Sequence, residues 1–212
     1  HCVAYKPHLA FYECYGIDGM RALDATVDYI RSKYPEIFLI ADAKRGDIGN
    51  TAKMYAKAFF EEMDFDAVTI APYMGADSVT PFLEYKDKWA IVLALTSNAS
   101  AYQFQNAQKD GKPLYQAVME EMMEISTPDN MMFVVGATKA DKLEELRSFC
   151  PDNFFLVPGV GAQGGSAEEV IAHGSNDHGG LLINSSRGIL YADHTEDFAK
   201  AAAIAAAQTA NL

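Results

Sequence analysis

The chain has 212 residues, enough for one α/β domain with a full hydrophobic core. Half of the residues are hydrophobic and 22% are charged, which is usual for globular proteins and excludes a disordered chain. The net charge of −12 argues against nucleic acid and anionic membranes as partners, although local Lys and Arg side chains could still hold a small anionic substrate.

Membrane and redox signals are weak throughout the sequence. No apolar run reaches transmembrane length, and no signal peptide is recognisable. Cys2, Cys14 and Cys150 form no CxxC pair, which is typical of reduced thiols in a cytoplasmic protein. The five histidines show no HxH or HxxxH spacing, so we expect no histidine-built metal site and no cofactor.

Short apolar runs alternate with longer amphipathic stretches along the chain. We predict strands over residues 2–5, 37–41, 67–71, 90–95, 132–135, 154–157 and 181–183. We predict helices over residues 19–34, 50–63, 113–125, 140–149, 167–173 and 196–208, and a weaker one over 78–85. The strands are almost continuously apolar, as in a parallel sheet that is covered on both faces. We find no linker or repeat and expect a single domain over residues 1–212.

Polar, small and charged residues follow nearly every predicted strand. A doubly wound sheet would place one or two such clusters at its switch point, whereas a (β/α)8 TIM-type barrel collects them at the carboxyl ends of all its strands. The sequence therefore predicts the barrel. Because seven strands are recognisable and a barrel needs eight, we expect that the first βα unit is missing from this sequence.

The first chemistry-bearing motif is Asp42-x-Lys44-x-x-Asp47, directly after a buried strand. Alternate residues share a face, so Asp42 and Lys44 should lie on the same side of the strand exit and shift each other's pKa. The alternative is a solvated charged loop that caps the following helix. Lys6 ends the first predicted strand and either joins the same site or is a lysine that reaches solvent.

A second motif lies near the carboxyl end of the chain. Residues 159–164 match GxGxxG, but the next strand ends in Asn-Ser-Ser-Arg instead of the acidic residue that a dinucleotide site requires. A glycine-rich loop followed by Arg187 fits the phosphate site of a barrel, where Gly161 and Gly164 would let backbone N–H groups approach the phosphate. A tight turn with a surface arginine is the alternative. Ser97 could bind a polar ligand or cap the following segment.

Together these motifs resemble the orotidine 5′-monophosphate decarboxylase family, in its longer subtype with the DAKRGDIGNTA signature, here residues 42–52. Pro158-Gly-Val-Gly-Ala-Gln163-Gly-Gly resembles the phosphate loop of that family. Tyr5-Lys6-Pro7, Pro72-Tyr73-Met74-Gly75, Thr96-Ser97-Asn98 and Ser186-Arg187-Gly188 match in order. The resemblance runs from about residue 1 to residue 193.

The resemblance implies a role for each matching position. Lys6, Asp42, Lys44 and Asp47 would form a Lys-Asp-Lys-Asp array. Asp47, with Ile48 and Thr51, would reach across a homodimer interface into the neighbouring active site. Ser97 would contact the pyrimidine amide, and Gln163 and Arg187 would bind the phosphate. The family's ribose-binding Asp has no counterpart here, and we expect it upstream, at the end of the missing strand.

The implied reaction is decarboxylation of orotidine 5′-monophosphate to uridine 5′-monophosphate without a cofactor, in pyrimidine biosynthesis. Its carbanion has no adjacent π-system to delocalise it, so the enzyme must use electrostatics. The barrier falls by roughly 20 kcal/mol or more, and some of this would come from remote binding of the phosphate. One rival is a metal-dependent sugar-phosphate enzyme of the same superfamily, but Lys6 stands where that enzyme carries a metal-binding Glu. The other is a non-catalytic phosphate-binding barrel, which would not need two acids near an anion.

Overall fold

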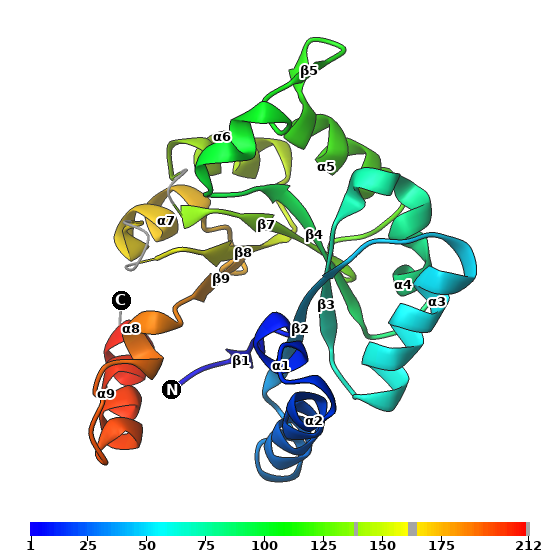
Figure 1. Ribbon diagram of the computed structural model, residues 1–212. Coiled ribbons are helices and arrows are strands. Elements are labelled where there is room, and N and C mark those ends of the chain that lie inside the picture. The colour runs from blue at the N-terminus through cyan, green and yellow to red at the C-terminus, as the bar shows by residue number, and fades with distance from the viewer. Residues whose placement is uncertain (138–139, 161–164, 211–212) are drawn as a thin grey trace. The chain divides into compact units, whose positions relative to one another are not determined.

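The structure is a computed structural model that describes residues 1–137, 140–160 and 165–210. Figure 1 labels the helices and strands of the chain. The chain divides into two compact units. The amino-terminal unit contains Cys2–Leu93 and Glu121–Met131, and the carboxyl-terminal unit contains His1, Ala94–Glu120 and Met132–Leu212.

Parallel strands form the centre of the amino-terminal unit. They are β1 (Ala4–Tyr5), β2 (Phe38–Arg45), β3 (Ala67–Ile70) and the first part of β4 (Trp89–Leu95), paired in that order. The helices are α1 (Ala10–Glu13), α2 (Gly16–Lys33), α3 (Gly49–Lys57), α4 (Thr80–Leu83), the π-helix η1 (Ala58–Glu62) and the 3-10 turns η2 (Pro72–Met74) and η3 (Ala76–Ser78). All four residues of β3 are buried. The strand therefore lacks the alternation of apolar and polar residues that a strand with one exposed face shows.

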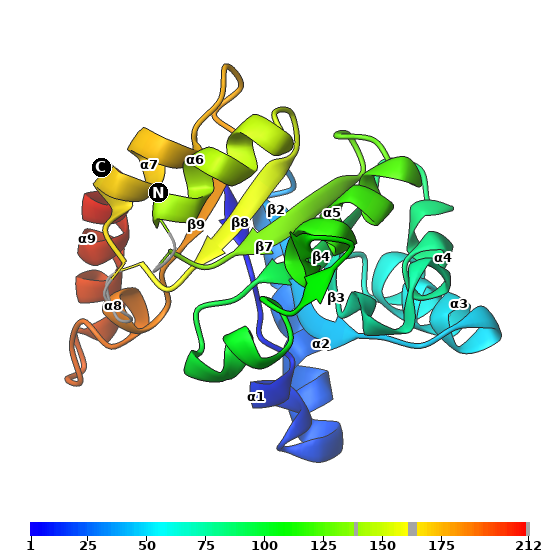
Figure 2. The ribbon, with the colours of Figure 1, turned by 90° about the horizontal axis from the view of Figure 1, so that it is seen from above.

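The carboxyl-terminal unit has the same βα pattern. Its parallel strands are β7 (Met131–Val135), β8 (Phe154–Pro158) and β9 (Leu181–Asn184). Helices α6 (Ala140–Phe149) and α7 (Ala167–Gly174) lie side by side on one face of these strands (Figure 2). The other elements are α8 (Arg187–Leu190), α9 (Phe198–Ala210), the 3-10 helix η4 (Ala99–Gln103) and the hairpin β5 (Gln108–Lys109) and β6 (Lys112–Pro113). Helix α5 (Leu114–Glu124) begins in this unit, and its residues from Glu121 onward belong to the amino-terminal unit.

Each of the seven predicted parallel strands is confirmed within two residues at every end except the carboxyl end of β2. The six main helices are also present, but the one predicted over 50–63 divides into α3 and the π-helix η1, and α2 begins three residues earlier than predicted. The weaker helix predicted over 78–85 is the short α4, which follows the turn η3. Among the described helices, none is long and apolar enough to cross a lipid bilayer. The eighth strand of a closed barrel and the single domain stay predictions.

The end of β2 differs from the prediction. We predicted that the strand ends at Ala41 and that the charged motif follows it, whereas β2 continues to Arg45. The backbone of Asp42 still pairs on one side, since its N–H donates to the carbonyl of Pro7 at 3.0 Å. On the other side the carbonyl of Arg45 accepts the N–H of Ala71 at 2.8 Å. The charged residues therefore belong to the strand, and their polarity concealed this in the sequence.

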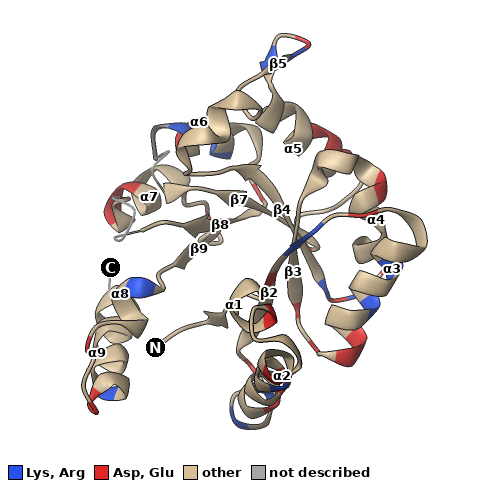
Figure 3. Ribbon diagram, viewed as in Figure 1, with Lys and Arg blue, Asp and Glu red and all other residues tan. Residues whose placement is uncertain are grey.

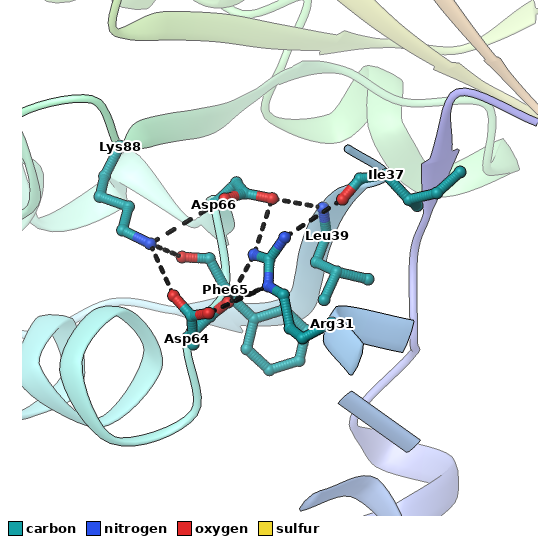
Figure 4. A network of polar contacts seen from close by, with 7 residues as sticks. All are labelled: Arg31, Ile37, Leu39, Asp64, Phe65, Asp66 and Lys88. Carbon is teal, nitrogen blue, oxygen red and sulfur yellow. Dashed lines mark hydrogen bonds and ion pairs between the residues drawn. The ribbon is translucent and has the colours of Figure 1, made fainter. Parts of the chain in front are cut away.

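A polar network joins the starts of β2 and β3 (Figure 4). The carboxylate of Asp66 accepts a hydrogen bond from the backbone N–H of Leu39 at 2.7 Å and forms an ion pair with Arg31 at 2.8 Å. Arg31 also pairs with Asp64, and Lys88 donates to the carbonyl of Phe65 at 2.7 Å. The Arg31 and Lys88 side chains are only 19% and 18% exposed, so the network closes this end of the unit with satisfied polar groups.

Candidate active site

The carboxylate of Asp42 lies at the centre of a charged cluster in the amino-terminal unit. Only 7% of the residue is exposed. Its Oδ2 forms an ion pair with Lys6, which directly follows β1, and lies 2.9 Å from Nδ1 of His8. Its Oδ1 forms an ion pair with Lys44. Figure 3 shows that acidic and basic positions both occur along β2. The structure thus brings together three of the four residues of the expected array.

Burial alone would raise the pKa of Asp42, because it penalises the charged form. The positive charge of Lys6 and the hydrogen bonds from Lys44 and Lys6 act in the opposite direction and prevail. The pKa of Asp42 is therefore lowered below its ordinary value, and the group is a carboxylate at neutral pH. A buried anion held between two ammonium groups is a fixed field that can act on a charged substrate.

Lys44 adopts an unusual backbone conformation. Its φ is +47°, in the left-handed region, which costs a residue with a side chain about 1–2 kcal/mol. The pairing of β2 with β3 shifts between Ala41 and Arg45, so the backbone N–H of Lys44 leaves the regular ladder. The hydroxyl of Thr69 on β3 accepts that N–H at 2.9 Å. Lys44 and Asp42 meet through this irregularity and not through simple strand alternation.

Thr69 and His8 also contact Asp42, and neither was predicted from the sequence. Thr69 is 1% exposed and its hydroxyl donates to Oδ1 of Asp42 at 3.1 Å. It is the one polar residue in the strand Ala-Val-Thr-Ile, which was the available signal. His8 is two residues beyond Lys6, and its backbone forms a parallel bridge with Asp42.

Arg45, which follows Lys44, joins the end of β2 to helix α1 and to the aromatic rings of α3 and η1. Its guanidinium forms an ion pair with Glu13 of α1 and donates to the carbonyl of Ala43 at 2.9 Å. It also lies over the rings of Tyr55 and Phe59, at 5.4 and 5.6 Å from their centres. This residue of the signature is structural, and it fixes the chain next to Lys44.

Asp47 does not contact the cluster around Asp42 within the described residues. Its Oδ1 accepts the backbone N–H of Ile48 at 2.8 Å, at the start of α3. Ile48 is 44% exposed, and Thr51 on the first turn of α3 is also exposed. Ile48 and Thr51 therefore face outward from the amino-terminal unit, and Asp47 beside them is half-buried.

Ser97 lies in the carboxyl-terminal unit, two residues after β4. Its Oγ is buried and has no hydrogen-bond partner among the described residues. It packs over Gly136, since a Cβ on that glycine would lie 1.9 Å from this Oγ. A buried hydroxyl without a partner costs free energy unless a ligand supplies one.

The glycine-rich loop and Arg187 follow β8 and β9. The loop begins at Gly159, whose φ of +98° requires glycine, and its ends meet through a bridge between Val160 and Gly165. Gly161, Gln163 and Gly164 lie outside the described residues. Arg187 opens α8 and is exposed, with no ion pair to any described residue. Its guanidinium can therefore receive an anion.

Three findings show what the chain resembles as a whole. The sequence profile of the "Orotidine 5'-phosphate decarboxylase / HUMPS family" matches residues 1–202. Orotidine 5'-phosphate decarboxylase of Christiangramia forsetii is 56% identical over 202 residues, which are 95% of this chain and 74% of that protein. The enzyme of the same name from Bacteroides fragilis is 56% identical over 207 residues, 97% of this chain and 76% of its own length.

Solved structures agree with the sequence relatives. The structure of Leishmania donovani OMP decarboxylase has a TM-score of 0.83 and 37% identity, and covers 95% of this chain and 77% of that one. The chain thus spans about three quarters of the length of these relatives. The profile match, the identity and the shared fold lead to one conclusion: the chain belongs to the orotidine 5'-phosphate decarboxylase / HUMPS family.

Proposed function

We propose that this protein decarboxylates orotidine 5′-monophosphate to uridine 5′-monophosphate in pyrimidine biosynthesis. The relatives that share more than half of its residues carry the name of this enzyme. The observation that carries the proposal is the buried carboxylate of Asp42, which is held between the ammonium groups of Lys6 and Lys44. Such an array serves a reaction in which an anionic substrate gains negative charge on one carbon.

In the proposed mechanism the bond between C6 of the pyrimidine and its carboxylate breaks, and the electron pair stays on C6. CO2 leaves, and the ammonium group of Lys44 stabilises the carbanion and then gives it a proton. Lys44 recovers that proton from solvent, to which 44% of its side chain is exposed. The charge of Asp42 lies close to the departing carboxylate and disfavours the ground state. No metal or cofactor enters this scheme.

The substrate-binding roles are part of the proposal. Ser97 would donate its buried hydroxyl to the pyrimidine amide, which would supply the partner that its Oγ lacks. Gln163, Arg187 and the backbone at Gly161 and Gly164 would bind the phosphate. Binding energy from the phosphate would then orient the reacting ring.

The test of the function is substitution of Lys44. We expect Lys44→Ala to lose at least about 1,000-fold in kcat, because it removes both the stabilising charge and the proton donor. Binding of uridine 5′-monophosphate, measured by titration calorimetry, should survive. Lys86→Ala is the matched control, since that side chain is 92% exposed. Near-normal turnover by Lys44→Ala would remove Lys44 from the chemistry, and wild-type turnover that a chelator abolishes would favour the metal-dependent rival.

We also propose a homodimer with shared active sites. Among the described residues, the Asp47 carboxylate bonds the backbone N–H of Ile48 and not the charged cluster of its own chain, and it lies beside exposed Ile48 and Thr51. In the family that the sequence resembles, these three side chains complete the site of the partner. The position of Asp47 at the outward-facing start of α3 supports the same role here.

Complementation tests the shared site. Asp47→Asn and Lys44→Ala should each be inactive alone, whereas a mixture contains dimers with one intact site. Random reassortment makes about half of the dimers mixed, each with one restored site of two, so about a quarter of wild-type activity should return. Mixed dimers that mass spectrometry detects but that show no activity would refute the proposal.

Three further points belong to the same proposal. The complete fold would be a closed eight-stranded barrel, with a ribose-binding Asp on the additional strand. The signature at residues 42–52 would assign the chain to the longer subtype of the family. The reaction would take place in the cytoplasm.

A further inference from the structure

Asp42 and Lys44 share a contact that neither the sequence motif nor the proposed mechanism uses. The hydroxyl of Thr69 donates to Oδ1 of Asp42 at 3.1 Å and accepts the backbone N–H of Lys44 at 2.9 Å. Thr69 is 1% exposed, so water does not compete for either hydrogen bond. The hydroxyl oxygen of Thr69 on β3 is therefore hydrogen-bonded to both Asp42 and Lys44 on β2.

The irregular end of β2 explains why a side chain is needed at this point. Ala41 pairs with Val68 and Arg45 pairs with Ile70, so three residues of β2 face the single residue Thr69. The backbone of β3 cannot satisfy the N–H of Lys44 across this bulge, and the Thr69 hydroxyl does so. The left-handed conformation of Lys44 is held by that hydrogen bond.

The direction of the hydroxyl proton follows from the same geometry. A threonine hydroxyl has one proton, and its oxygen accepts the N–H of Lys44. The proton is then free to point at Oδ1 of Asp42, which as a carboxylate can only accept. Val or Ala at position 69 would lose both hydrogen bonds, whereas Ser would keep them.

We infer that Thr69 is a positioning residue for the decarboxylation: it holds the carboxylate of Asp42 and the backbone of Lys44 in the arrangement that the reaction uses. This inference rests on the proposed function. Because Thr69 is 1% exposed and acts through Asp42 and Lys44, we expect its effect on the chemical step and not on nucleotide binding. A small displacement of a catalytic group is enough to slow such a step strongly.

The experiment compares Thr69→Val with Thr69→Ser in the wild-type background. Val has the same shape as Thr and favours a strand equally, so the loss is confined to the hydroxyl. We expect kcat to fall about 10- to 100-fold for Thr69→Val, with KM and the Kd of uridine 5′-monophosphate changed less than about threefold. Thr69→Ser should recover most of kcat.

Two controls separate positioning from general stability. Ser78→Ala removes another buried hydroxyl of the same unit, which donates to the carbonyl of Gly75 at 2.7 Å, and should lower Tm without lowering kcat. If Thr69→Val gives no folded protein, Thr69→Cys replaces it, since a thiol is a weak donor and should reduce kcat at least severalfold.

The outcomes are distinct. Full kcat in Thr69→Val or Thr69→Cys would overturn the inference, and so would a Thr69→Ser variant as slow as Thr69→Val, which would assign the loss to packing. Parallel losses in kcat and nucleotide binding would overturn it too. A wild-type protein that does not turn over orotidine 5′-monophosphate would instead refute the proposed function.

Discussion

Replacement of Asp42 by Asn should destabilise the protein, although it removes a buried charge. The change leaves the ammonium groups of Lys6 and Lys44 near each other without the carboxylate between them. The Lys6 side chain is only 11% exposed, so its charge loses its partner in a poorly hydrated place. Breaking a buried ion pair on one side costs about 3–5 kcal/mol.

The lower end of that range applies here. The Lys44 side chain is 44% exposed and can turn to water, and an Asn side chain can still accept the Thr69 hydroxyl. We therefore expect a loss of about 3 kcal/mol, which for a chain of this size lowers Tm by about 6–12 °C. Asp18→Asn is the matched control, since its carboxylate is 89% exposed and its ion pair with Arg21 should contribute less than about 1 kcal/mol.

The pH dependence gives a second, independent reading. The folded-state pKa of Asp42 is lowered, whereas the unfolded chain has the ordinary carboxyl pKa of about 3.9. The stabilisation is thus fully present above about pH 5, and it is lost as the pH falls below about 4 toward the folded pKa. The difference in free energy of unfolding between wild type and Asp42→Asn should stay constant from pH 5 to 8 and shrink in acid.

Urea unfolding at pH 3, 6 and 8 measures this difference. Lys6, Lys44 and His8 are the other charged or titratable side chains in contact with Asp42. If Asp42→Asn is as stable as wild type at pH 6 to 8, the free-energy cost of burying the Asp42 charge offsets its attraction to Lys6 and Lys44. That result would refute the reasoning.

Three further predictions concern the carboxyl-terminal unit. Arg187→Ala should raise KM at least 10-fold and affect a substrate without phosphate far less, and equal losses on both substrates would argue against phosphate binding. Gly136→Ala should lower kcat/KM, because the new Cβ would lie 1.9 Å from Oγ of Ser97 and would displace that side chain. Unchanged kinetics would show that the position of the Ser97 hydroxyl does not matter for the reaction. Arg147→Lys should lower Tm by about 4–12 °C at constant kcat, since the guanidinium donates to five backbone carbonyls and lies 4.0 Å from the ring centre of Phe155. A melt that matches wild type would contradict that account.

The strand and helix order could be predicted because the parallel strands are buried on both faces and therefore read as short, continuous apolar runs. The amphipathic period identified the long helices in the same way. The three-residue pairing of β2 with Thr69 could not be predicted, because the register of neighbouring strands is a tertiary property. The short helix α1 and the hairpin β5–β6 carry no periodicity to detect, since each is too brief.

The candidate site was predicted as a set of residues but not as a geometry. Lys6 and Asp42 are 36 positions apart, and only the adjacency of β1 and β2 places them in contact. The positive φ of Lys44 has no sequence signal, because a left-handed backbone usually carries glycine or asparagine. The contribution of His8 depends on the backbone bridge between β1's continuation and Asp42, which the sequence could not reveal.

The network in Figure 4 has a consequence for how the charge of the whole strand is balanced. The network contacts β2 at Leu39, three residues before Asp42. That separation is about 10 Å along the strand, which is close to one Debye length at 0.1 M salt. The two cations, Arg31 and Lys88, and the two carboxylates, Asp64 and Asp66, cancel. The network thus has no net charge that would act on the array of Lys6, Asp42 and Lys44. Removing a single member would leave a net charge about 10 Å from Asp42, so stabilising redesign of this end should exchange its ions in opposite-sign pairs.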